Sequence, residues 1–324
     1  GKDGDTNWVK NNLVKFNKNY NHKNTDIRNY LALEKIFKKY KSSIKLIIHS
    51  AAQPSHDWAK KEPFVDFNIN ALGTLNLLSL TKKYSYNAPF IFLSTNKVYG
   101  DNPNLLPLRE LSSRWEILKK HKYFRGINES MSLDNSIHSF FGASKCYADL
   151  IVQEYGKNDG LKTVCFRASC ITGPNQSGAK LHGFLSYLIK CAIKNEPYTI
   201  NGSGKQVRDN LHAWDLMNMF WHFYQDPRAG EVYNAGGGRD NSISILEAIE
   251  KINEILAKLN FDNNSYFWWA FNFTSKNPLT SSLVNKLLDV FAIIGIIENV
   301  APRYPGLFLE IQTCCLKGLN KQRM

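Results

Sequence analysis

Three short apolar runs, each ending in small or polar residues, constrain the fold of this chain more than any other feature. Short runs that are apolar throughout are typical of strands buried on both faces of a parallel sheet. Segments with helical spacing of apolar residues separate them, which predicts an α/β fold with a doubly wound parallel sheet. The apolar runs are IKLIIHSAA (44–52), APFIFLST (88–95) and LKTVCFRAS (161–169). The helical segments are residues 27–40, 65–84 and 140–160.

The ends of these runs carry the polar residues that chemistry requires, in HSAAQ (49–53), STNKVYG (94–100) and FRASC (166–170). Because ligands bind at the carboxyl ends of parallel strands, we expect the three segments to converge on one site. Glycine and proline interrupt the pattern near Gly173. We therefore predict two parts, residues 1–172 and a smaller α+β lobe over residues 173–324.

The chain has a formal net charge of +13, from 41 Lys and Arg residues against 28 Asp and Glu residues. Such an excess suits a polyanionic partner, because these cations neutralise phosphate. The lysines are scattered, however, and form no long basic block. We therefore expect solvated surface charge and no nucleic-acid partner, while a phosphate-bearing small substrate fits the charge equally well.

The six cysteines show neither a CxxC motif nor metal-ligand spacing, so we expect no metal site and a reducing, cytoplasmic environment. The most apolar stretch, VFAIIGII (290–297), is far shorter than the ~20 residues that span a bilayer. We therefore expect no membrane segment.

The clearest chemical pattern is a hydroxyl at a strand end, Thr95, together with Lys145 in the segment HSFFGASK (138–145). A lysine can lower the pKa of a nearby phenol so that the phenolate accepts a proton. The residue one helical turn before Lys145 is Phe141, however, and a phenyl ring carries no proton. Either His138 or Tyr99 replaces the missing base, or the chain binds its ligands without turning them over.

Taken in order, seven stretches resemble the extended branch of the short-chain dehydrogenase/reductase family, the NAD-dependent epimerases and dehydratases. Within that family they are most similar to the CDP-paratose 2-epimerases, also called CDP-tyvelose epimerases. The resemblance implies a Rossmann-type sheet, a bound NAD, a nucleotide-sugar substrate and a homodimer. The seven stretches are residues 47–58, 70–76, 94–101, 141–149, 165–174, 204–212 and 230–238.

The resemblance also implies roles for individual residues. Thr95 and Lys145 would be catalytic, with Phe141 at the position of the usual tyrosine and His138 as a candidate base. Arg208 would grip the substrate pyrophosphate, since a guanidinium can fork onto two oxygens. The residues expected to bind the substrate are Asn96, His182 and Arg208. The residues expected to bind NAD are Asp26, Ile27, Ala51, Ala52, Gln53, Asn70, Lys145, Ala168 and Ser169.

One local feature selects among the reactions of the family. The 4,6-dehydratases follow the threonine with Asp-Glu, whereas Thr95 is followed by Asn96 and Lys97. Without these carboxylates we expect epimerisation and not dehydration. A 4-epimerase of another nucleotide sugar and a catalytically silent binding protein remain as alternatives.

Two departures from the family pattern are expected to affect the fold. The glycine-rich fingerprint of the first strand–turn–helix is absent from the sequence, so we expect an N-terminally truncated chain that begins after the second strand. The resemblance fades after about Asn260, and we assign residues 260–324 no function.

Overall fold

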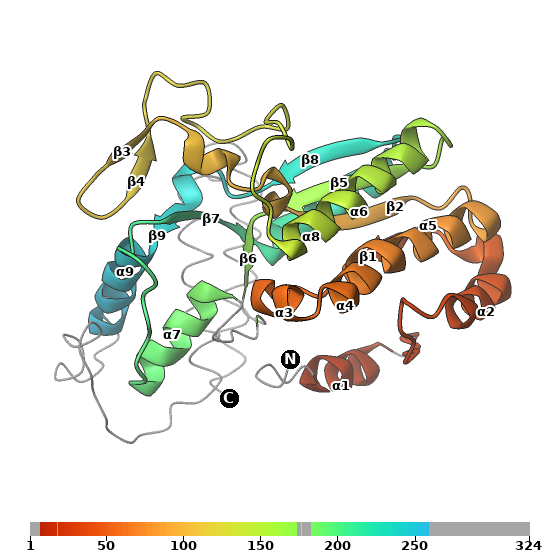
Figure 1. The fold of residues 1–324 in the computed structure, drawn as a ribbon. Coiled ribbons are helices and arrows are strands. Elements are labelled where there is room, and N and C mark those ends of the chain that lie inside the picture. Colours follow the sequence, from red (N-terminus) through yellow and green to blue (C-terminus); the bar gives the residue numbers. More distant parts are fainter. Residues whose placement is uncertain (1–6, 18, 174–175, 177–182, 259–324) are drawn as a thin grey trace.

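The structure is a computed structural model in which residues 7–17, 19–173, 176 and 183–258 are described. Its larger part is built on a four-stranded sheet in which every neighbouring pair is parallel. Figure 1 shows this sheet with helices on both faces, which confirms the predicted α/β fold with a parallel sheet. In order across the sheet, the strands are β1 (Ile47–His49), β2 (Phe90–Thr95), β5 (Thr163–Ala168) and β8 (Glu231–Ala235).

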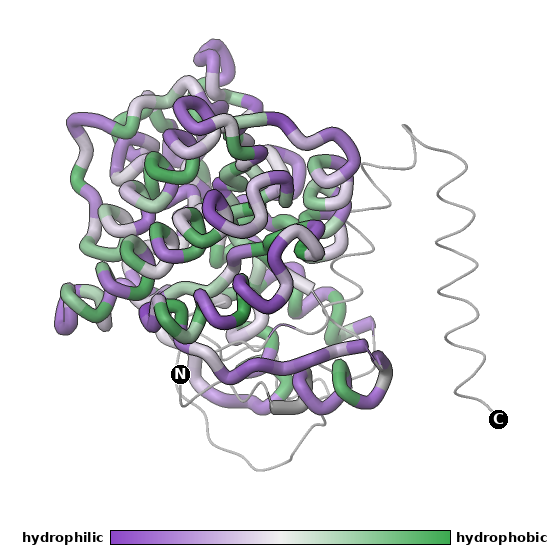
Figure 2. Tube along the Cα trace, turned by 90° about the vertical axis from the view of Figure 1, so that its right-hand side faces the viewer, coloured by the Kyte–Doolittle hydropathy of each residue, from purple (hydrophilic) through white to green (hydrophobic). Residues whose placement is uncertain are grey.

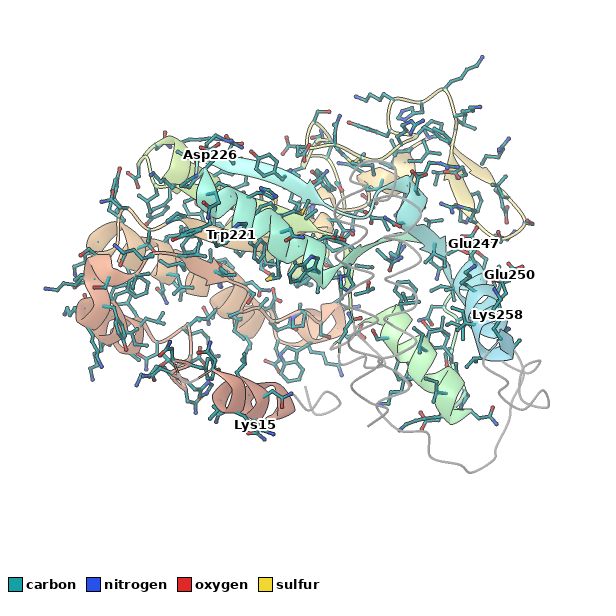
Figure 3. All side chains as sticks on the ribbon, turned by 180° about the vertical axis from the view of Figure 1, so that it is seen from behind. Lys15, Trp221, Asp226, Glu247, Glu250 and Lys258 are labelled. Carbon is teal, nitrogen blue, oxygen red and sulfur yellow. The ribbon has the colours of Figure 1, made fainter. Side chains whose placement is uncertain are left out.

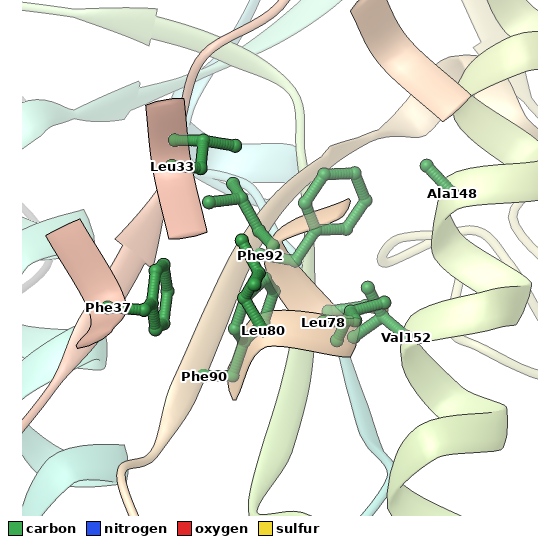
Figure 4. Close-up of a cluster of buried hydrophobic side chains, with 10 residues drawn as sticks. Leu33, Phe37, Leu78, Leu80, Phe90, Phe92, Ala148 and Val152 are labelled. Atoms are coloured by element: carbon green, nitrogen blue, oxygen red, sulfur yellow. The ribbon is translucent and has the colours of Figure 1, made fainter. Parts of the chain in front are cut away.

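The two central strands are largely apolar because successive side chains enter different cores on the two faces of the sheet. Phe90 and Phe92 of β2 pack with side chains from α2, α5 and α6, as Figure 4 shows for part of this cluster. Ile91, between them, packs with Phe220 of α8 on the opposite face. Full burial of such a side chain stabilises the fold by about 1.5–3 kcal/mol. The helices are α2 (Tyr30–Tyr40), α5 (Gly73–Tyr84), α6 (Phe140–Lys157) and α8 (Ala213–Gln225).

The segment that we predicted as one helix, residues 65–84, contains a wider turn. Helix α4 (Pro63–Phe67) leads into a π-helical turn, η2 (Asn68–Leu72), before α5 begins. Such a turn inserts an extra residue without interrupting the helix, and it is frequent at functional sites. Here it carries Asn70, which becomes important below.

A smaller part contains a mixed sheet of the order β6-β7-β9, in which β7 is parallel to β6 and antiparallel to β9. Helices α7 and α9 pack against each other through a separate apolar cluster. A two-stranded hairpin, β3–β4, lies beside this part (Figure 1). The strands are β3 (Leu108–Glu110), β4 (Trp115–Ile117), β6 (Cys170–Thr172), β7 (Val207–His212) and β9 (Ser242–Ser244), and the helices are α7 (Phe184–Lys194) and α9 (Ile245–Lys258).

The two parts are interleaved along the chain. Strand β8 and helix α8 follow Gly173 in the sequence but pack in the larger part. The division at residues 172 and 173 stays a prediction, as does the missing first strand–turn–helix. In the described part of the chain, β1 is the outermost strand on its side, and helix α1 (Asn7–Phe16) precedes α2. Residues 260–324 lie outside the described residues.

None of the described helices is long and apolar enough to cross a membrane. Figure 2 shows hydrophobic and hydrophilic residues alternating along the described helices, as expected for helices with one buried face. Within the described ranges no group of three His, Cys, Asp or Glu side chains could hold a metal ion.

Candidate active site

The hydroxyl of Thr95 stands at the carboxyl end of β2, where the chain turns into the 3₁₀ helix η3 (Asn96–Tyr99). Its Oγ1 accepts a hydrogen bond from the backbone N–H of Lys97, at 3.3 Å, and so caps η3. Strand pairing sets Thr95 beside Ala168 at the end of β5. The N–H of Ser169, one residue further, donates to the carbonyl of Ala235 at the end of β8. Three predicted site residues therefore meet at one edge of the sheet.

Lys145 is buried under that edge, on the second turn of α6. Its Nζ donates to the carbonyl oxygen of Leu93 at 2.8 Å and lies 4.0 Å from the ring centroid of Phe92. The residue is only 3% exposed, and burial lowers the pKa of its ammonium to about 8. An ammonium has three N–H donors, and in the described structure Nζ makes this one hydrogen bond. Lys145 therefore has donors left for a hydroxyl-bearing ligand.

The start of α6 is held close to η3. Ser139 is the N-cap, and its Oγ accepts from the N–H of Gly142 at 3.0 Å. A Cβ at Gly142 would stand 3.1 Å from the carbonyl oxygen of Lys97, so a larger residue would push the helix away. This packing sets the distance between Thr95 and Lys145.

Asn70, in the π-helical turn, ties three elements to α6. Its Oδ1 accepts from the N–H of Gln53, while its Nδ2 donates to the Gln53 carbonyl, to Asp66 and to Ser144. The bond to Ser144, at 3.1 Å, fixes the helix beside Lys145. Gln53 also donates through Nε2 to Asp66, so the segment after β1 is anchored by its own side chain.

The other residues predicted to bind NAD lie after β1 and before α2. Ala51 and Ala52 are exposed just after β1. The carboxylate of Asp26 accepts from the guanidinium of Arg28, which lowers the pKa of Asp26. Ile27 packs directly over Gly73, where its Cδ1 would be 2.6 Å from an added Cβ.

Two cations near Thr95 (Lys97 and Arg208) lie close enough for the charge of one to affect the other. Arg208 extends from β7, and the only hydrogen bond of its guanidinium in the described structure is from Nη1 to its neighbour's carbonyl. Burial, and then the charge of Arg208, lowers the pKa of Lys97. Neither side chain is paired with a carboxylate within the described ranges. Asn96 lies between Thr95 and Lys97 in the chain. His182 lies outside the described residues.

The neighbours of Phe141 are the least expected feature of the site. The imidazole of His56 packs against it edge to face, with 4.9 Å between ring centroids. The Nδ1 of His56 lies 2.8 Å from the Oγ of Ser139. We did not predict His56 as a site residue. Its place just after the end of β1 is the one sequence signal that could have found it.

The two bases suggested from the sequence are already engaged. Both ring nitrogens of His138 face backbone carbonyls, those of Ser136 at 3.1 Å and Val98 at 2.7 Å. The hydroxyl of Tyr99 donates to Asn234 and accepts from Arg167. Burial raises the pKa of Tyr99. Neither His138 nor Tyr99 therefore has a free proton-accepting atom in the described structure. Their role as the base stays a prediction.

Residues 5–236 match the family described as NAD dependent epimerase/dehydratase family. The chain belongs to this family. It is 34% identical over 243 residues to a CDP-paratose 2-epimerase of Salmonella typhi, which covers 73% of this chain and 70% of that protein. It is 32% identical over 222 residues to a dTDP-D-glucose 4,6-dehydratase of Dictyostelium discoideum, which covers 68% of this chain and 46% of that protein.

Among solved structures, the fold is similar to that of a UDP-glucose 4-epimerase of Thermotoga maritima crystallised with UDP-glucose. The TM-score is 0.62 at 19% identity, over 91% of this chain and 98% of that one. At this identity the similarity concerns the fold alone. The family description includes NAD, and the described residues fit its nicotinamide ribose, because the buried Lys145 has unused donors beside the strand ends.

Proposed function

We propose that this protein is a nucleotide-sugar epimerase that binds NAD and acts on a CDP-sugar as a 2-epimerase. The observation that carries the proposal is the placement of Thr95 beside a buried Lys145, with Asn96 and Lys97 where the dehydratases have carboxylates. The similarity to a CDP-paratose 2-epimerase supports the choice of substrate.

The roles that the resemblance implies are supported by the positions of these residues. Thr95 is set to hydrogen-bond the oxygen of the reacting sugar carbon, since its side chain stands at the strand end. Lys145, with Asn70 bracing its helix, holds the nicotinamide ribose. Arg208 and Lys97 neutralise the charge of the substrate pyrophosphate. When bound, NAD supplies the acceptor for the hydrogen on the sugar carbon, and its later return leaves no net redox change.

Dehydration is disfavoured for a chemical reason. Loss of water needs an acid that protonates the leaving hydroxyl. Asn96 carries an amide, which is no such acid, and neither of the two positions after Thr95 carries a carboxyl group. The groups that follow Thr95 therefore suit a reaction without loss of water. In such a reaction the ketone formed rotates or rebinds with its other face exposed, and it is then reduced again.

The test is to incubate the purified chain with NAD and either CDP-paratose or CDP-tyvelose, and to follow the sugar protons by NMR. Interconversion is the expected result, and with a substrate deuterated at C2 the deuterium should be retained in the product. UDP-glucose and UDP-galactose provide the control for the alternative 4-epimerase. Stoichiometric binding of NAD and CDP without conversion of any sugar would favour the silent binding protein instead.

We also propose that the chain forms a homodimer. Helices α4 and α6 present a shared outer face of exposed apolar side chains. Phe67 and Tyr147 pack against each other there, with 5.9 Å between ring centroids. Phe64, in the same face, is 82% exposed. A self-complementary patch of this kind suits a two-fold interface with a second copy of the chain.

A further inference from the structure

We infer that the imidazole of His56 accepts the proton of the sugar hydroxyl and later returns it. This is the role that a phenol at position 141 would have. The inference rests on the proposed epimerase function and names a catalytic residue for it. It follows from three features of the structure: the position of the ring, its partner and its charged neighbours.

The backbone places the ring at the start of α6. His56 is the first residue of helix α3 (His56–Lys61), and Ser55 caps that helix by accepting from the N–H of Trp58. Its ring lies 4.9 Å from that of Phe141, at an interplanar angle of 64°. The imidazole therefore stands next to the position from which a tyrosine would act.

The hydrogen-bond partner of the ring lies at Nδ1, so Nε2 is the nitrogen without a partner in the described structure. The Oγ of Ser139 accepts from the N–H of Gly142 and retains a lone pair for a second donor. The inference assigns the neutral ring the tautomer in which Nδ1–H donates to this oxygen, 2.8 Å away, so that the Nε2 keeps its lone pair. The Nε2 has no hydrogen-bond partner in the described structure. Ser139 is therefore a positioning residue, and the Nε2 of His56 is the proton acceptor.

The charged neighbours favour the neutral ring. Burial contributes most to lowering the pKa of His56, and the ammonium of Lys97, on η3, lowers it further. Asp57 on α3 and Asp66 on α4 oppose this change. The net direction is below the usual value of 6.5, so the imidazole can accept a proton at neutral pH.

The step balances in protons and electrons. The O–H bond of the sugar would break and its proton would go to Nε2, while bound NAD would supply the acceptor for the hydride from the C–H bond, and the C=O bond would form. In the reverse direction the hydride would return to the opposite face of the carbon and the proton would return from Nε2 to the oxygen, which would leave His56 neutral again.

The decisive comparison is between His56→Gln and His222→Gln, which makes the same change at an exposed histidine of α8. We expect His56→Gln to lower kcat by about 10²–10⁴-fold, the usual contribution of a proton-transfer group. Its affinity for CDP, measured by calorimetry, should stay within about twofold of the parent chain, because general-base catalysis acts on turnover and not on nucleotide binding. His222→Gln should match the parent chain in both measurements.

A second variant, Phe141→Tyr in the His56→Gln chain, restores the phenol. We expect it to recover at least about tenfold in kcat, with the acid limb of the pH profile shifted to higher pH, since a phenol replaces an imidazole. Without reference to activity, ¹H–¹⁵N spectra of the histidine rings should show His56 titrating below 6.5 and protonated at Nδ1 when neutral.

The outcomes separate the inference from the proposed function. An active parent chain with unchanged turnover in His56→Gln would overturn the role of His56 and leave the epimerase intact. An inactive parent chain that becomes active on Phe141→Tyr would also overturn it, because no group of the parent chain would then act as the base. Inactivity of both chains on every sugar would overturn the proposed function and the inference together.

Discussion

Arg167 and Asp149 form a two-point ion pair inside the protein, between β5 and α6. The Nη2 of Arg167 lies 2.8 Å from one carboxylate oxygen and its Nε lies 3.1 Å from the other. Asp149 is fully buried and Arg167 is 5% exposed. The pair lies one helical turn beyond Lys145, so it fixes the helix that carries the buried lysine.

Breaking this pair is expected to destabilise the fold strongly. Asp149→Asn leaves the guanidinium of Arg167 buried without its counter-charge, which costs about 3–5 kcal/mol of unfolding free energy. Urea unfolding of the single variant measures the loss. The double variant Asp149→Leu with Arg167→Met removes both charges and should recover more than half of it. Equal loss in both variants would mean that packing, and not the unpaired charge, sets the cost.

His49 makes stability depend on pH below neutrality. Its Nε2 lies 2.8 Å from the Oγ1 of Thr74, and burial, aided by the charge of Lys145, lowers its pKa to about 3. The unfolded chain therefore binds the proton first. Stability from this group is fully present above pH 6.5 and is lost as pH falls toward 3, up to about 5 kcal/mol.

The measurement is the unfolding free energy across this range for the parent chain and His49→Gln, which retains a side chain able to hydrogen-bond Thr74. The variant should show a smaller decrease toward acid. Parallel curves would show that the pKa of His49 is the same in the folded and unfolded states.

The sequence was sufficient for the parts of this protein in which local pattern and tertiary role coincide. Residues 90–93 of β2 are apolar because both faces of the strand are covered, so this run predicted the strand. Thr95 and Lys145 were predicted as site residues because each belongs to a short motif. The contact between His56 and Ser139 was not predicted because it joins residues 83 positions apart, and no local pattern encodes such a contact. The π-helical turn at 68–72 was missed because one extra residue barely changes the apolar period.

Lys145 makes stability rise with pH in the same direction as His49, but in the alkaline range. Its folded-state pKa, about 8, lies below the usual 10.5 because burial disfavours the charge. Stability should therefore rise between pH 8 and 10.5 as the buried ammonium loses its proton, by about 3 kcal/mol at most. In Lys145→Met this rise should be absent, and turnover should be lost. Unfolding measured at several alkaline pH values tests the first point, and a rise retained in the variant would contradict it.

Arg208 and Lys97 are expected to act on substrate binding through charge. Arg208→Met removes a guanidinium that can fork onto the pyrophosphate, and the loss of such a charged contact should weaken CDP binding by about 2–3 kcal/mol. Affinity should also fall less steeply with added salt in the variant than in the parent chain. Calorimetry at two salt concentrations provides both values. Arg239→Met, which changes a guanidinium paired with Glu116, is the matched control. An equal loss in both variants would argue against a direct contact between Arg208 and the ligand.

The apolar face on α4 and α6 is expected to hold two copies of the chain together. Phe64→Glu places a carboxylate at its most exposed aromatic position, and burying that charge in an interface would be unfavourable. Light scattering after gel filtration should show a dimer for the parent chain and a monomer for the variant. Trp221, labelled in Figure 3, is 59% exposed on the outer side of α8, away from this face. Trp221→Glu should therefore remain a dimer. If Trp221→Glu dissociates the dimer and Phe64→Glu does not, then α8 forms the interface, and the exposed rings on α4 must have another partner.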